Sequence, residues 1–205
     1  MFSTKQIVGL CASALLLASC ASAAKPGAMM VPVDETRIIA QSSPLFESVA
    51  VDQIEGGKET SPLWKSNVSN EDFAEALRQS LSAHTMLAVG DATYSVQAEL
   101  VKVKQPVMGF SFTVTSTVKY TVRDADDAVV FEQEIVSPYT ASMSDAFVGV
   151  ERLRLANEGS IKENISQFLD GLIAEVQGQP QAPASDMTEP ALSSPSASAS
   201  ETPVM

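Results

Sequence analysis

The sequence has few of the residues that most catalytic and metal sites require. It contains two cysteines and a single histidine, His84, among 205 residues. A Ser-His-Asp triad needs a histidine base, and zinc sites are built from sets of cysteine and histidine. No serine lies in a G-x-S-x-G turn, and no H-E-x-x-H pair is present. The sequence therefore predicts a protein that is not an enzyme, with no catalytic residues, metal ligands or cofactor.

Positive charge is also scarce. Lysine and arginine total 13 against 25 aspartates and glutamates, which gives a net charge of -12. Such a surface repels the phosphates of nucleic acids and the headgroups of anionic lipids. Nucleic acid is therefore not expected as a partner, and any attachment to a membrane must depend on something other than charge.

Long hydrophobic runs are absent except for one near the amino terminus. Lys5 precedes an uncharged apolar run over residues 7–19, which is 13 residues long. This length suits the hydrophobic region of a secretory signal peptide, whereas a membrane-spanning helix needs about 20 residues. We therefore expect an exported protein whose signal peptide covers residues 1–19.

A cysteine stands directly after this run. Leu17, Ala18, Ser19 and Cys20 resemble the lipobox of bacterial lipoproteins. This resemblance implies cleavage before Cys20 and attachment of acyl chains, palmitate among them, to that residue. The competing interpretation is ordinary cleavage at the small residues Ala21 and Ala23, which fit an Ala-x-Ala site.

The lipobox resemblance also implies a location. Lipoproteins of enteric bacteria that carry aspartate after the cysteine tend to stay in the inner membrane, and here Ala21 takes that place. We therefore expect lipid anchoring in the outer membrane, with the domain facing the periplasm. Cys11 leaves with the signal peptide, so the mature chain has no intramolecular disulfide.

Composition divides the mature chain into three parts. Residues 20–32 are small, contain proline and glycine, and predict an acylated cysteine with a flexible tether that reaches up to ~40 Å when extended. Residues 33–177 form the candidate domain. Residues 178–205 are rich in serine, alanine and proline without a basic residue, which predicts a disordered acidic tail.

Hydrophobic periodicity predicts an α+β domain. Extended regions are expected over 37–57, 94–103, 110–123 and 128–136, with a bulge near Val101 where the alternation changes phase. Helices are expected over 70–84, capped by Ser69, and from Ser144 or Asp145 to Val176, with a break near Gly149 or Gly159. The order predicts an antiparallel sheet of about four strands with two helices packed on one face.

This β-α-β-β-β-α order behind a lipobox resembles small outer-membrane lipoproteins of Gram-negative bacteria, including those related to the lipopolysaccharide-assembly lipoprotein. Residues 154–172 look like the closing helix of envelope lipoproteins. The resemblance implies a non-enzymatic lipoprotein that acts in cell-envelope assembly or maintenance through protein contacts. The alternative is an accessory protein that binds or transports lipid or lipopolysaccharide.

Two groups of residues are candidates for binding. Val107, Met108 and Phe110 lie in a turn where polar residues are usual, with Lys102 and Lys104 beside them. They either pack under a neighbouring loop or contact a lipid or an envelope protein, and the lysines suit an anionic headgroup. Arg152 and Arg154 form the second group, as internal ion pairs of a helix or as a clamp for a ligand.

Overall fold

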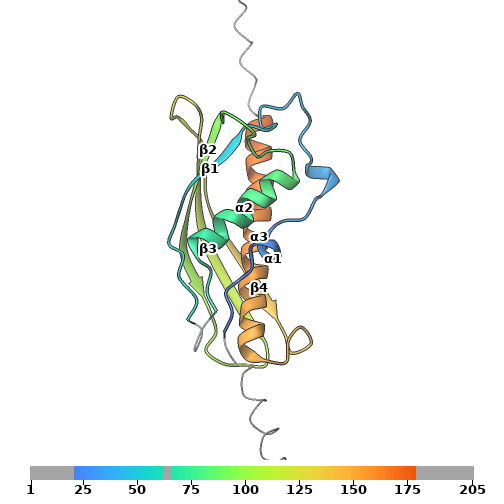
Figure 1. Ribbon diagram of the computed structural model, residues 1–205, viewed down its shortest axis with the longest axis vertical. Helices are drawn as coiled ribbons and strands as arrows, with labels where there is room; N and C mark the ends of the chain where they lie inside the picture. The colour runs from blue at the N-terminus through green and yellow to red at the C-terminus, as the bar shows by residue number, and fades with distance from the viewer. Residues whose placement is uncertain (1–20, 62–65, 179–205) are drawn as a thin grey trace, which may run out of the picture.

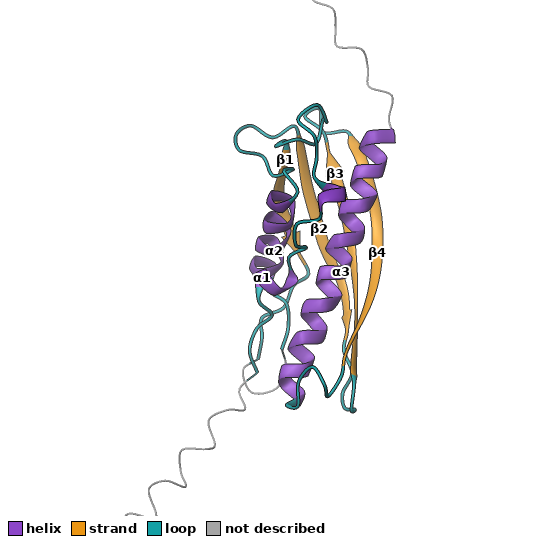
Figure 2. Ribbon diagram, turned by 90° about the vertical axis from the view of Figure 1, so that its right-hand side faces the viewer, coloured by secondary structure: helices purple, strands orange, loops and turns teal. Residues whose placement is uncertain are grey.

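The computed structural model describes residues 21–61 and 66–178 (Figure 1). A four-stranded sheet carries its helices on one face (Figure 2). The strands are β1 (Val49–Glu55), β2 (Tyr94–Lys104), β3 (Phe112–Arg123) and β4 (Val129–Ala141), and the helices are α1 (Pro26–Met29), the 3-10 turn η1 (Glu35–Arg37), α2 (Asn70–Ala83) and α3 (Gly149–Gly178). The predicted α+β class is confirmed. The predicted signal peptide, Cys20 and the tail after Gly178 lie outside the described residues.

The sheet is mixed, whereas the sequence pattern predicts an antiparallel one. Its order is β1-β2-β3-β4, with β1 parallel to β2 and the other two pairs antiparallel. The reason is the connection over residues 56–93, which carries α2 across one face, so that β2 starts at the same end as β1. Short hairpin connections cannot do this, and the other pairs are accordingly antiparallel.

The first strand is shorter than expected. Residues 37–41 are not a strand, because the chain there leaves the turn η1 and continues as a loop. Asp34 caps η1 by accepting a hydrogen bond from the Thr36 backbone nitrogen. Arg37 then binds the Asp170 carboxylate of α3 at 2.7 and 2.9 Å. The cap of η1 is local, but the ion pair with Asp170 is a contact with a distant element, and together they outweigh the strand preference of the β-branched residues.

The remaining strands follow the sequence pattern closely. Every second residue of β3 is buried, from Phe112 to Val122. The register between β2 and β3 shifts between Leu100 and Lys102, so Val101 forms the predicted bulge. β4 continues beyond the expected end at residue 136 to Ala141, with Pro138 inside it. A proline is tolerated there because β4 is an edge strand of the described sheet.

Helix α2 begins and ends as its sequence predicts. The Ser69 hydroxyl oxygen accepts a hydrogen bond from the Asp72 backbone nitrogen at 3.1 Å, and Val68 and Phe73 are both buried beside this cap. His84 follows the last turn and is fully buried, with its Nδ1 2.7 Å from the Ser80 carbonyl oxygen. This histidine is thus part of the packed helix end.

Of the two positions where a break is expected, Gly149 is the first residue of helix α3, whereas Gly159 lies within its 30 continuous residues and breaks nothing. The glycine is instead required by a close contact, because a Cβ at this position would lie 2.3 Å from Cδ1 of Tyr139 on β4. The next residue, Ser160, accepts a hydrogen bond from the Ser116 backbone nitrogen at 2.9 Å and donates one to the Ser137 carbonyl at 2.7 Å. Small residues thus allow α3 to lie against β3 and β4.

The start of α3 also differs from the prediction. Asp145 does not cap the helix, because its carboxylate accepts hydrogen bonds from the backbone nitrogen and hydroxyl of Ser142 at 2.7 and 2.8 Å. These bonds hold the pKa of Asp145 below its ordinary value. The helix begins four residues later, at Gly149.

The segment expected to be a flexible tether is folded from Ala21 onward. We call residues 21–31 the N-terminal segment. Ala24, Met29 and Val31 are buried in the main hydrophobic core, and α1 contacts both α2 and α3 (Figure 2). The composition is typical of a linker, but these apolar side chains fill the space beside the two helices. Their burial offsets the entropy lost on ordering the segment.

The substitution Met29→Ala tests this packing. Because Met29 is fully buried, the change should lower the free energy of unfolding by about 2–5 kcal/mol. Denaturant unfolding of the full chain measures the effect. Met30→Ala is the matched control, since Met30 is only half-buried and should cost much less. Equal costs for the two variants would mean that the N-terminal segment does not dock as described.

Candidate functional site

Two loops lie together at one end of the sheet. Residues 105–111 connect β2 to β3, and residues 142–148 connect β4 to α3. Phe112, the first residue of β3, pairs with Ala141, the last residue of β4, so both loops leave the sheet at the same end of the strands. We call this end of the domain the loop end; it is the lower end in Figure 1.

Arg152, in the first turn of α3, joins the two loops. Its Nη1 donates to the carbonyl oxygens of Ala146 and Phe147 at 3.0 and 3.3 Å, and its Nη2 donates to the carbonyl of Gly109 at 3.3 Å. The guanidinium also lies over the ring of Phe112, with Cζ 4.7 Å from the ring centroid. The forked geometry and the cation–π contact suit arginine and not lysine.

The loops that Arg152 holds expose large apolar side chains. Val107 is 94% exposed, Met108 83%, Phe110 84% and Phe147 82%, and Val148 is also exposed. We call these five residues the apolar patch. Scattered apolar residues are common on protein surfaces, but several together on one end indicate a contact surface. Val107, Met108 and Phe110 are therefore not packed under any loop that the structure describes, and their contact with a lipid or an envelope protein stays a prediction.

Sequence reasoning misses Phe147 and Val148. The signal is present in the apolar run over residues 146–148, directly before Gly149. With Ser144 or Asp145 as the expected cap, these three residues fall in the first turn of the predicted helix and are not considered as a loop. Because the helix starts later, both side chains lie in a loop and face solvent.

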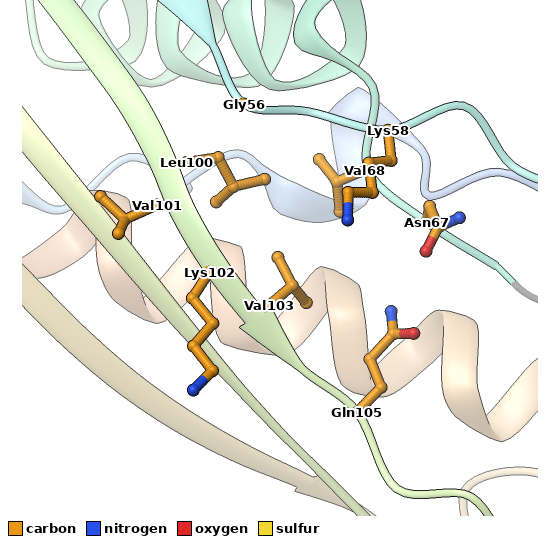
Figure 3. A pocket seen from close by; sticks show the side chains of 9 residues that line it. All are labelled: Gly56, Lys58, Asn67, Val68, Leu100, Val101, Lys102, Val103 and Gln105. Atoms are coloured by element: carbon orange, nitrogen blue, oxygen red, sulfur yellow. The ribbon is translucent and has the colours of Figure 1, made fainter.

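Lys102 and Lys104 are exposed on the last part of β2, as a surface role requires. The strand β1 ends at Glu55, opposite Glu99, so the edge of β2 that follows is not covered by it. A cavity of about 170 Å³ lies beside this edge, lined by Lys58, Val68, Lys102, Val103 and Gln105 among others (Figure 3). This cavity lies next to the loop end, because Gln105 is the first residue of the β2–β3 loop.

The N-terminal segment begins at the same end of the domain. The Ala24 backbone nitrogen donates to the Asn67 carbonyl at 3.3 Å. The neighbouring Ser66 carbonyl accepts hydrogen bonds from Gln105 at 3.1 Å and from Asn157 of α3 at 2.9 Å. Because Gln105 opens the β2–β3 loop, these bonds place Ala24 beside the loop end.

Arg154 forms the internal ion pairs that the sequence suggests. It binds Glu151 and Glu158 of α3, with Nε donating to Glu151 at 3.0 Å. These hydrogen bonds lower the pKa of Glu151 and raise that of Arg154 from their ordinary values. Glu158 also accepts a hydrogen bond from the Lys25 backbone nitrogen at 2.9 Å. This hydrogen bond attaches the N-terminal segment to α3, and the ion pair with Arg154 holds Glu158 in place to accept it.

Within residues 21–61 and 66–178, no three histidine, cysteine, aspartate or glutamate side chains are grouped so as to hold a metal ion. The same part of the chain contains no helix with the length and apolar character needed to cross a membrane. Cys20, the predicted acylation site, lies outside the described residues.

Comparison with known proteins relates this chain to others by fold. No protein-family model and no curated protein sequence matches it. A Xanthomonas campestris protein of the family DUF330 superposes with a TM-score of 0.54 at 6% identity, over 77% of this chain and 98% of its own. At this identity the similarity concerns the fold alone.

Two further solved structures are described as lipoproteins. One, a candidate lipoprotein from Caulobacter crescentus CB15, gives a TM-score of 0.47 at 14% identity, covering 66% of this chain and 95% of its own. The other, a minor lipoprotein from Acinetobacter baumannii, gives 0.41 at 11% identity, covering 68% and 98%. With TM-scores below 0.5, these two similarities support no conclusion about the family or role of this chain.

The substitution Arg152→Lys tests the link between the loops. A lysine cannot reach three carbonyls while covering a ring, so we expect a loss of about 1–3 kcal/mol in unfolding free energy. Hydrogen exchange of peptides covering residues 105–111 and 142–149 should become faster. Arg123→Lys, at the opposite end of β3, is the control and should leave both peptides unchanged. Unchanged exchange in Arg152→Lys would contradict the assigned role.

Proposed function

We propose that this chain is a lipoprotein anchored in the outer membrane by acyl chains on Cys20, with its domain in the periplasm. The observation that carries the proposal is the lipobox, residues 17–20, whose first three residues end an apolar run of 13 residues and whose cysteine follows that run directly. A four-residue pattern is weak by itself, but this position is where the lipoprotein signal requires it. Two or more acyl chains hold a protein firmly on a bilayer without help from its charge.

The domain has a non-enzymatic role in this proposal and acts in envelope assembly or maintenance through protein contacts. The helices cover one face of the sheet and leave the other face uncovered by any described helix (Figure 2). On β3 this outer face presents Thr113, Thr115, Thr117 and Thr121 together with Lys119. A polar, partly exposed face of this kind resembles the surfaces of non-obligate protein complexes.

A second candidate function is supported by the apolar patch. Exposed valine, methionine and phenylalanine side chains can contact the acyl chains of a lipid or a lipopolysaccharide, as an accessory protein for lipid transport requires. The two candidates place the functional contact on different surfaces, which are the outer face of the sheet and the loop end.

The substitution Cys20→Ala tests the anchor. The variant should lose the acyl chains and the cleavage before residue 20, and should no longer carry the mass of the diacylglyceryl group. Intact mass spectrometry of the full chain expressed in a Gram-negative host, together with membrane fractionation, measures this. Cys11→Ala is the matched control and should be acylated normally, because residue 11 lies in the predicted signal peptide. A wild-type mature protein that lacks acyl chains would refute the proposal.

Affinity capture with the acylated full chain tests the role. We expect an envelope protein to be recovered by the wild type and lost in Thr115→Arg/Thr117→Arg, which places two large cations on the outer face of the sheet. Met108→Asp should retain this partner. Recovery of no envelope protein would contradict the protein-contact role. Binding of an amphiphile that disappears in Met108→Asp would instead support the lipid-accessory function.

A further inference from the structure

The distance between the predicted anchor and the folded domain is very short. A tether over residues 20–32 would reach ~40 Å, but the N-terminal segment is folded onto the domain. Ala21, bonded directly to Cys20, is only 6% exposed, and Ala24 is 2% exposed. Consecutive Cα atoms are about 3.8 Å apart, so acyl chains on Cys20 start within a few ångströms of the domain surface.

Backbone hydrogen bonds fix the N-terminal segment along its length. The Ala24 nitrogen donates to the Asn67 carbonyl at 3.3 Å, and the Lys25 nitrogen donates to Glu158 at 2.9 Å. Further along, the Val31 nitrogen donates to the Ser80 hydroxyl at 2.9 Å. The segment therefore provides no slack between the bilayer and the domain. An acylated Cys20 requires the domain to touch the leaflet.

The part of the domain that this anchor brings to the leaflet is the loop end. Gln105 and Asn157 both bind the Ser66 carbonyl, next to the Asn67 carbonyl that holds Ala24. The apolar patch extends from the loops at this end. Anchor and patch thus lie at one end of an elongated domain, whose long axis runs vertically in Figure 1.

The charges at the loop end favour the same contact. Lys25, Lys102 and Lys104 are exposed there, although the whole chain is acidic. Two carboxylates of this region are occupied by protein groups, since Asp145 accepts hydrogen bonds from Ser142 and Glu151 binds Arg154. Exposed lysines beside exposed apolar side chains are typical of surfaces that lie in the headgroup region of a bilayer.

We propose that the domain stands end-on upon the leaflet that holds its acyl chains, with the apolar patch inserted among the lipid headgroups. This inference rests on the proposed acylation of Cys20. The occupant of the patch is the lipid surface itself. Helix α3 runs away from the loop end, and its 30 residues place Gly178 about 45 Å from the leaflet. The outer face of the sheet then stands upright in the periplasm, accessible to a protein partner.

Site-specific fluorescence on the acylated full chain tests the orientation. Because Cys20 is acylated and Cys11 is removed, a single introduced cysteine can be labelled with an environment-sensitive probe. Met108→Cys reports the apolar patch, and Ala125→Cys, in the β3–β4 turn, reports the opposite end. In vesicles of phosphatidylethanolamine and phosphatidylglycerol with a spin-labelled lipid, we expect quenching at residue 108 to be at least threefold that at residue 125.

A second set of variants tests the contribution of the patch. With the probe at Phe147→Cys, the change Val107→Asp/Met108→Asp should remove most of the quenching by lipid. Val89→Asp is the matched control, because Val89 is 83% exposed, like Met108, but lies in the loop before β2, at the other end of that strand. It should leave the quenching unchanged. All substituted positions are exposed, so the variants should fold as the wild type does.

The outcomes separate this inference from the function on which it rests. Intact mass without acyl chains on Cys20 would refute the anchor itself. An acylated protein whose probes at residues 108 and 125 are quenched equally would overturn only the end-on orientation. The end-on orientation would also be overturned by a probe at residue 108 that is shielded in whole envelopes but exposed to water in vesicles that contain no other protein. Another envelope protein would then cover the patch.

Discussion

The close contact of α3 with β3 and β4 is the interaction on which the rest of the structure depends. Ser160 bonds to the backbones of Ser116 and Ser137, and Gly159 leaves room for the ring of Tyr139. A larger residue at either helix position would force the helix away from the sheet. Buried polar groups are costly when unpaired, so these hydrogen bonds also determine where along the strands the helix lies.

The position of α3 in turn organises the loop end. Three groups in the first three turns of the helix make these contacts. Arg152 holds the two loops, and Asn157 binds the carbonyl of Ser66. Glu158, paired with Arg154, binds the backbone of the N-terminal segment. The apolar patch and the first described residue are thereby placed at one end of the molecule. A single helix thus relates the proposed anchor to the surface that the anchor would bring against the membrane.

Local patterns predict most of the fold. The cap at Ser69, the alternation along β3 and the bulge at Val101 each depend on neighbouring residues, and all three are present. The sequence singles out Val107, Met108 and Phe110 because apolar residues are unusual in a turn. In the structure all three side chains are exposed. The parallel pairing of β1 and the absence of a strand at residues 37–41 depend on contacts with distant elements, which no local pattern contains.

The sequence by itself determined the α+β class, the order of the elements and the identity of Cys20 as the candidate for acylation, because each is a property of short stretches of chain. Only the tertiary structure decided that Gly159 is a contact and not a break, that Phe147 joins the patch, and that residues 21–31 are part of the core. Each of these depends on which surfaces meet. A small, apolar segment is a linker if nothing packs against it, and here α2 and α3 do.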